Sequence, residues 1–327
     1  MGALSYEFLK QELTGSQKAK PDSYQNSPLY YTITGRKGAR LYKSKFSSMV
    51  VCEHPHIEQR LMVFPEIGKA DYELTASVLN MIDPPKNGVQ LARYSAGELE
   101  TLKRKLENLN YSAVSGVSIV EEHVMDWRYP VHVLDTAKVQ ALEGKEFKQI
   151  RKKFRKAAEH ITHIPLNQDN ALRLMRATLK FWEGNMIANE KDTDDMSEFY
   201  LELFKIMDEN PGQVNGLFFM QGRRPVGFTV WDQTAPDISN CFVNLGDTSI
   251  TGLSDYQMVS VCQDLNKRGI RYLNIGGSEI KSLDDFKIKY QPAESVELLS
   301  ADVLYRRVEN VNISAHTLVE SSSYLLP

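Results

Sequence analysis

The stretch RYLNIGGSEIKSLDDFKIKYQP, from Arg271 to Pro292, decides the fold. Its first residues, Tyr272–Ile275, are typical of a strand, and the pair Gly276-Gly277 ends that strand. Glycine adopts backbone angles that other residues avoid, so the chain can turn away from the sheet at this point. A helix is predicted to follow from Ser282. The pattern fits a gap beside the strand that receives a substrate, and it also fits an ordinary strand–loop–helix connection.

Length and composition indicate a globular protein of two domains. The chain has 327 residues, and domains commonly hold roughly 150 residues each. The net charge is 39 − 42 = −3, so a nucleic-acid partner would need a local basic patch. Cys52, Cys241 and Cys262 show no metal-binding spacing and indicate thiols in a reducing compartment, and we expect no metal. No apolar run approaches the ~20 residues that span a bilayer, which predicts a cytoplasmic protein.

The first half of the sequence predicts short strands, two helices and further strands. Ser95 and Glu98 form a capping box, which predicts the start of the second helix. The predicted elements are strands at Tyr30–Thr34, Ala39–Tyr42, Ser47–Glu53 and Leu61–Pro65, helices at Tyr72–Ile82 and after Ser95, and strands at Ala113–Glu121 and Tyr129–Leu134.

The second half predicts the order β-α-α-β-β-β-α-β-α-β. Its turn Gly222–Pro225 separates two of three consecutive antiparallel strands. The predicted elements are a strand at Ile161–Leu166, helices at Ala171–Trp182 and from Ser197, strands at Gly216–Gln221, Val226–Asp232 and Ser239–Asp247, a helix at Tyr256–Lys267, a strand at Arg271–Ile275, a helix at Leu283–Tyr290 and a strand at Glu297–Tyr305.

Between the two halves lies the most basic stretch of the chain. KEFKQIRKKFRK, Lys145–Lys156, holds seven cations and one acid. Phe147, Ile150 and Phe154 recur at helical spacing, which predicts an amphipathic helix with one docked face. The remaining face is either a solvated linker or a phosphate-binding surface. The candidate phosphate ligands are Lys148, Arg151, Lys152 and Arg155.

The element order of the second half resembles the GNAT acyltransferase fold. In that fold the central sheet opens between its fourth and fifth strands, here Ser239–Asp247 and Arg271–Ile275. The resemblance implies an α+β sandwich with two GNAT-like domains in tandem, joined by the basic helix. The expected division is 1–27 as an N-terminal arm, 28–143 as a degenerate GNAT-like domain, 144–160 as the bridging helix, 161–305 as the catalytic GNAT-like domain and 306–327 as a C-terminal tail.

The run GLSDYQMVSVCQDLNKRGIRYLNIGGSEIKSLDDFKIKYQP, Gly252–Pro292, resembles the soluble C-terminal portion of phosphatidylglycerol lysyltransferases and their stand-alone relatives. This resemblance implies an aminoacyltransferase that moves an aminoacyl group from charged tRNA to an amine or hydroxyl acceptor. Aminoacyl-tRNA would be the co-substrate and no further cofactor is expected. Two alternatives stay open, an acyl-coenzyme-A-dependent N-acyltransferase of the same fold and a non-catalytic tandem GNAT binding module.

The turn after the fourth strand departs from that of coenzyme-A-dependent GNAT enzymes. Those enzymes usually carry a glycine-rich turn whose amides bind the pyrophosphate. Here Asp247–Asp255 contains one glycine and begins and ends with an acid, which disfavours a pyrophosphate. At the end of the same strand the lipid-modifying enzymes have Asp-Leu-x-Arg, where this sequence has Asn-Leu-Gly-Asp, residues 244–247. The acceptor is a small molecule or a lipid head group, and this change favours the small molecule.

Residues near the predicted opening supply the candidate site. Transfer from an activated ester requires orientation of the acceptor, removal of its proton and stabilisation of the oxyanion. Carboxylates are candidates for the base or for binding the donor's amine, and lysines for the oxyanion, with only one of the two lysines directed into the opening. The catalytic candidates are Glu279, Lys287, Lys289, Asp247 and Asp255, and the substrate-binding candidates are Asn244, Gly276, Gly277 and Ser278.

Overall fold

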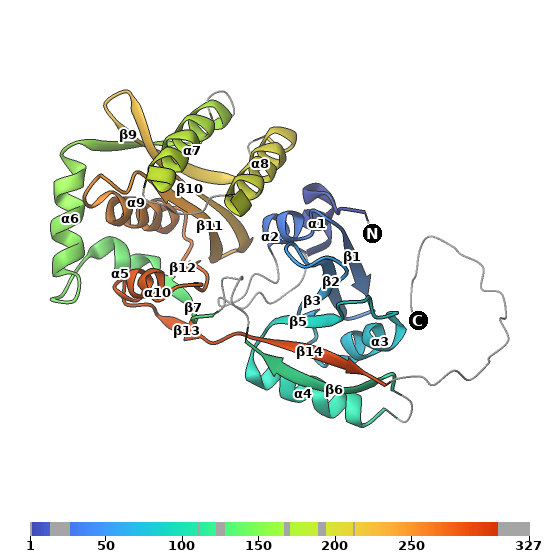
Figure 1. The fold of residues 1–327 in the computed structure, drawn as a ribbon. Helices are drawn as coiled ribbons and strands as arrows, with labels where there is room; N and C mark the ends of the chain where they lie inside the picture. The colour runs from blue at the N-terminus through green and yellow to red at the C-terminus, as the bar shows by residue number, and fades with distance from the viewer. Residues whose placement is uncertain are drawn as a thin grey trace. The chain divides into compact units, whose positions relative to one another are not determined.

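A computed structural model of the chain describes residues 2–13, 27–109, 112–121, 128–166, 171–188, 194–211 and 213–306. The chain divides into two compact units, each with its own sheet and helices (Figure 1). The first unit comprises Met1–Leu4, Thr34–Glu122 and Leu298–Pro327, and the second comprises Ser5–Ile33 and His123–Glu297.

The first unit contains a seven-stranded sheet of order β1-β2-β3-β5-β14-β6, with β4 paired to β2. Ser95 caps α4 through the predicted reciprocal bonds with Glu98, and the leucines on its inner face are buried against the sheet. The elements are β1 (Ala39–Lys43), β2 (Ser47–Glu53), β3 (Leu61–Val63), β4 (Ile67–Gly68), α3 (Glu73–Met81), β5 (Val89–Tyr94), α4 (Ala96–Glu107), β6 (Val114–Val120) and β14 (Leu299–Tyr305).

The second unit is built on a seven-stranded sheet of order β13-β7-β12-β11-β10-β9-β8. Neighbouring residues of β9 face opposite sides of this sheet: Phe218 packs in the cluster with α7 and α8, and Phe219 in the cluster with α6 and α9. The elements are α1 (Tyr6–Leu13), α2 (Pro28–Thr34), β7 (Val131–Asp135), α5 (Thr136–Ala141), α6 (Lys148–Ala158), β8 (Ile161–Pro165), α7 (Ala171–Ala188), α8 (Asp194–Glu209), β9 (Asn215–Gln221), β10 (Arg224–Ala235), β11 (Ile238–Gly246), α9 (Leu253–Lys267), β12 (Tyr272–Asn274), α10 (Lys281–Ile288) and β13 (Glu294–Val296).

The predicted divergence of the fourth and fifth strands is present. β11 and β12 are parallel and pair only from Ile238↔Tyr272 to Asn240↔Asn274. Beyond that point β11 continues to Gly246, whereas the other strand stops before Gly276, whose φ is +70°. A positive φ favours glycine, so the sequence allows the chain to leave the sheet here. The sheet therefore opens along the second half of β11.

One prediction for the N-terminal part of the chain was wrong. The segment Tyr30–Thr34 is not a strand but lies in helix α2, because Ser27 Oγ accepts a hydrogen bond from the Tyr30 amide at 3.0 Å and Pro28 suits the first helical turn. Within the predicted N-terminal arm, 1–27, helix α1 buries Tyr6, Leu9 and Leu13, and residues 14–26 lie outside the described part of the chain.

The predicted last strand of the catalytic half belongs to the other sheet. β14 pairs with β5 and β6 and buries Ala301 and Val303 in the core of the first unit. Its expected place beside the second sheet is taken by β7 and β13, with β7 antiparallel to β12. The Ile275 amide donates to the His132 carbonyl at 2.9 Å and extends that pairing beyond β12.

Candidate functional site

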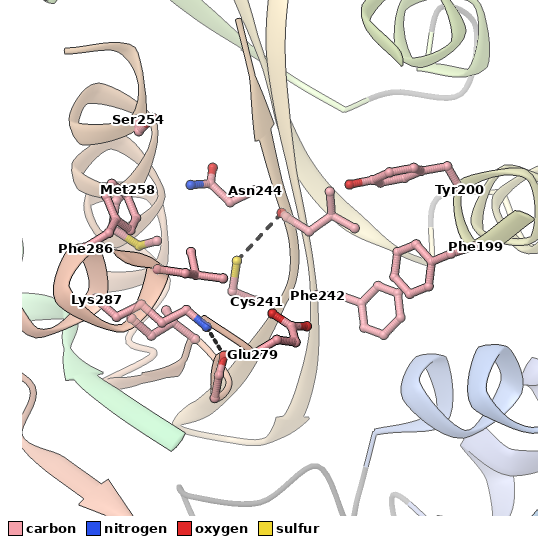
Figure 2. A pocket seen from close by; sticks show the side chains of 14 residues that line it. Phe199, Tyr200, Cys241, Phe242, Asn244, Ser254, Met258, Glu279, Phe286 and Lys287 are labelled. Carbon is pink, nitrogen blue, oxygen red and sulfur yellow. Dashed lines mark hydrogen bonds between the residues drawn. The ribbon is translucent and has the colours of Figure 1, made fainter. Parts of the chain in front are cut away.

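A pocket occupies the opening between β11 and the chain that follows β12 (Figure 2). Its volume is about 370 Å³, within the range of small-molecule sites. All of its lining residues belong to the second unit. They are Phe199, Tyr200, Cys241, Phe242, Val243, Asn244, Ser254, Met258, Ile275, Gly277, Glu279, Leu283, Phe286 and Lys287.

Four of the predicted site residues line this pocket: Asn244, Gly277, Glu279 and Lys287. Glu279 and Lys287 are half-buried and supply the formal charges of the described lining. Lys287 Nζ donates to the Gly277 carbonyl, which fixes the ammonium beside the glycine break. Asn244 Oδ1 accepts from Thr229 Oγ1 at 2.7 Å, and this contact orients the carboxamide at the end of β11. The break thus brings a carboxylate, an ammonium and an amide to one cavity.

The two candidate lysines have different surroundings. Lys289 does not line the pocket; its Nζ lies 2.7 Å from Asp255 Oδ1 and 3.9 Å from the centre of the Phe286 ring. Burial lowers the pKa of Lys289, partly opposed by the charge of Asp255. The Asp255 carboxylate is buried and also accepts from the Tyr290 hydroxyl at 3.0 Å. The ion pair of Lys289 with Asp255 joins α9 to the end of α10, which gives both residues a role in holding the two helices together.

Asp247 is also held in structural contacts rather than in the pocket. It is 2% exposed, forms an ion pair with Arg224, and accepts from the Ser249 amide at 3.0 Å and the Ser249 hydroxyl at 2.6 Å. The Ile250 amide donates to the Asp247 carbonyl at 3.1 Å. The carboxylate therefore organises the turn between β11 and α9, and two of the turn's amides are already occupied.

The remaining candidates at the break support the backbone. Gly276 accepts from the His132 amide at 3.2 Å, and its own amide donates to Asn274 Oδ1 at 2.7 Å. Ser278 is fully buried, and its carbonyl accepts from the Tyr129 amide at 3.0 Å. Neither residue lines the pocket, so they fix the path of the chain that presents Glu279.

A buried polar network that the sequence did not suggest holds α10 against β7. His132 Nε2 lies 2.8 Å from Asp284 Oδ1, and His132 Nδ1 lies 2.8 Å from Ser295 Oγ. Lys281 adds an ion pair to Asp284 at 2.9 Å. Burial alone would raise the pKa of Asp284, but the contacts with His132 and Lys281 hold it below its usual value. The network fixes the helix that carries Lys287.

The opposite wall of the pocket was also missed. Phe199 and Phe242 stack with ring centres 5.1 Å apart, and Tyr200 contacts the edge of Phe199 at 5.3 Å. These residues come from α8 and β11, far in sequence from the glycine break. Phe218 and Trp231, by contrast, are buried in the core. Only the strand alternation of β11 hinted that Phe242 faces the opening.

The basic helix has the two faces expected from its sequence. Phe154 stacks on Tyr256 of α9 with ring centres 5.3 Å apart, and Gly252 lies so close to the Lys153 carbonyl that a side chain there would clash. Its other face borders a hollow of about 330 Å³ lined by Lys148, Arg151, Lys152, Arg155, Lys156 and Glu159. Arg151 differs from its neighbours because its guanidinium donates to the Leu142 and Gly144 carbonyls.

Among the residues that the structure describes, no group of three or more His, Cys, Asp or Glu side chains is placed to hold a metal ion. No helix of the described chain combines the length and apolar character needed to cross a membrane. The three cysteines are buried and form no disulfide.

The comparisons with solved structures agree with this architecture. A conserved protein of unknown function from Bacteroides thetaiotaomicron superposes with a TM-score of 0.73 at 14% identity, covering 92% of this chain and 98% of that one. L-PGS from Bacillus licheniformis gives 0.63 at 13% identity, with coverages of 94% and 92%. FemX gives 0.62 at 8% identity, with coverages of 92% and 96%.

These likenesses and the opened sheet confirm the predicted α+β architecture of two GNAT-like domains. None of the curated proteins matches the sequence. The family described as phosphatidylglycerol lysyltransferase, C-terminal, matches residues 130–312, which is more than half of the chain and includes the whole pocket. The chain therefore belongs to the phosphatidylglycerol lysyltransferase C-terminal family.

Proposed function

We propose that this protein transfers an aminoacyl group from aminoacyl-tRNA to an amine or hydroxyl of a small molecule or a lipid head group. The observation that carries the proposal is the pocket at the sheet opening, where Glu279, Lys287 and Asn244 meet. Family membership supports acyl transfer as the reaction class. L-PGS and FemX share the fold, which makes aminoacyl transfer the reaction to test first.

The pocket's polar groups suit the steps of that reaction. In this proposal Glu279, which lines the pocket, binds the donor's α-ammonium or takes a proton from the acceptor. Lys287 stabilises the oxyanion that forms when the acceptor attacks the ester carbonyl. The Asn244 carboxamide offers a further hydrogen bond to donor or acceptor. The ester of aminoacyl-tRNA is already activated, so orientation and charge stabilisation supply most of what the reaction needs.

The turn before α9 supports tRNA over coenzyme A as the donor. In coenzyme-A-dependent enzymes this turn offers free amides to a pyrophosphate. Here the Ser249 amide binds the Asp247 carboxylate and the Ile250 amide binds the Asp247 carbonyl. A pyrophosphate at this turn would compete with these bonds and approach a buried carboxylate. The exposed cations of α6, which packs against the same turn at Gly252, offer sites for tRNA phosphates instead.

Equilibrium binding tests this choice. We expect charged tRNA to bind at micromolar concentration or below, and acetyl-coenzyme A to show no binding below millimolar concentration in calorimetry. Micromolar binding of acetyl-coenzyme A would instead favour the conventional acyltransferase. Binding of tRNA without any effect of this protein on the aminoacyl ester would favour the non-catalytic module.

A further inference from the structure

The pocket has a charge balance and a shape that select among aminoacyl groups. In its described lining Glu279 is the acid and Lys287 the base, so the two formal charges cancel. Side chains of four aromatic residues border the same space: Phe199, Tyr200, Phe242 and Phe286. In the view of Figure 2, Glu279 is drawn between Lys287 on one side and the Phe199–Phe242 pair on the other.

From this arrangement we infer that the donor's amino-acid side chain is uncharged and apolar, of the size of methionine, leucine or phenylalanine. The inference rests on the proposed function and adds the class of donor. Every aminoacyl ester carries an α-ammonium, and Glu279 supplies one carboxylate to bind it. The side chain is then directed to the rest of the lining, which is predominantly apolar.

A lysyl group fits this pocket poorly because it brings a second cation. The described lining offers no second carboxylate, and the Lys287 ammonium repels the ε-ammonium. Placing a charge in an apolar site without a partner is costly. The stacked rings of Phe199 and Phe242 cover one another's inner faces, with an interplanar angle of 13°, so fewer ring faces remain for a cation–π contact. Methionine has a similar length without the charge and packs well against aromatic rings.

The test separates the aminoacyl group from the tRNA body. A single tRNA sequence is prepared uncharged and with methionine, phenylalanine or lysine attached through a 3′-amide, which cannot be hydrolysed or transferred. The dissociation constants of these four ligands are measured with the full-length protein. We expect methionyl- and phenylalanyl-tRNA to bind at least ~10-fold more tightly than uncharged tRNA, and lysyl-tRNA to bind roughly 10²-fold more weakly than methionyl-tRNA.

Two variants sharpen the result. Phe242→Asp adds a second carboxylate to the pocket, and we expect it to reverse the preference between methionyl- and lysyl-tRNA. Phe46→Asp makes the same change at a 62%-exposed phenylalanine of the first unit and should leave the ranking unchanged. The wild-type ranking stands as a test by itself if Phe242→Asp does not fold.

The outcomes distinguish failure of the inferred donor class from failure of the proposed function. Tighter or equal binding of lysyl-tRNA by the wild-type protein overturns the apolar donor but leaves aminoacyl transfer in place. If all four tRNAs bind equally, the pocket does not receive the aminoacyl group, and the proposed function fails together with this inference.

Discussion

Replacement of Glu279 by glutamine removes the negative charge of the described pocket lining while keeping the size and hydrogen-bonding shape of the side chain. If the carboxylate binds the donor's α-ammonium about 4 Å away, the attraction is about 4 kcal/mol at the effective dielectric constant of a protein surface. The side chain is half-buried, so solvent screening reduces this attraction to about 2–3 kcal/mol. About 2–3 kcal/mol corresponds to a loss of roughly 10²-fold in kcat/KM.

The assay is the single-turnover loss of a radiolabelled amino acid from charged tRNA in the presence of acceptors. Glu294→Gln makes the same substitution at an exposed position of β13 and serves as the matched control. We expect Glu279→Gln to reduce the rate about 10²-fold, with a thermal unfolding midpoint close to that of the control. Full activity of Glu279→Gln would refute the assignment of this carboxylate, and a large loss of stability would give it a structural role.

The remaining predictions concern the lysines of α10, the basic helix and one buried acid. Lys287→Met should reduce transfer about 10²-fold with little change in stability. Lys289→Met should retain transfer per folded molecule but lower the free energy of unfolding by roughly 2–4 kcal/mol, because the buried Asp255 carboxylate loses its ion-pair partner. Equal behaviour of the two variants in denaturant titrations and rate assays would contradict this. The double variant Lys148→Glu, Lys152→Glu should weaken tRNA binding and reduce the slope of log affinity against log salt by roughly two, and an unchanged slope would make α6 a solvated helix. Burial raises the pKa of Asp232 from 3.8 to about 6, so the folded state binds its proton more tightly and stability falls as the pH rises from about 4 to about 6. This decrease amounts to up to about 3 kcal/mol in the free energy of unfolding, and Asp232→Asn should remove it. An equal decrease in the variant, measured as the pH dependence of unfolding, would show that another group is responsible.

The local part of the fold was predictable because its signals lie within a few residues of each other. The capping box at Ser95 and the glycine break at Gly276 each act through neighbouring backbone groups, and both appear as predicted. The segment Tyr30–Thr34 misled the prediction because its aromatic and β-branched residues favour strands. The pair Ser27-Pro28 in front of it was the better signal, since it caps and starts a helix.

The strand allocation was not predictable from local patterns. β14 has the same alternation whichever sheet it joins, and its place beside β5 and β6 depends on burial of Ala301 and Val303 far from its neighbours in sequence. The partners in ion pairs also depend on the tertiary structure and could not be predicted from local patterns. Asp247 meets Arg224 across a hairpin, and this contact gives the carboxylate a structural position that its sequence did not reveal.

The part of the candidate site that lies close to the glycine break in sequence was predictable, and the part contributed by distant segments was not. The glycine break located Glu279 and Lys287 at the sheet opening, because Glu279 follows the break directly and Lys287 lies in the next helix, α10. Phe199 comes from a helix about 80 residues earlier, and only the tertiary structure brings it to the pocket. His132 is likewise joined to Asp284 by the pairing of β7 with the second sheet.

The most direct test of the proposed function is to measure aminoacyl transfer. Purified protein is incubated with one tRNA charged with radiolabelled methionine and with a set of small-molecule amines, hydroxyl compounds and phosphatidylglycerol vesicles, and the label is followed by chromatography. We predict that label leaves the tRNA faster than in protein-free controls and appears covalently on an acceptor, and that Lys287→Met reduces the formation of this product about 10²-fold. The proposed function would be contradicted if the label stays on the tRNA while acetyl-coenzyme A delivers an acetyl group to the same acceptors.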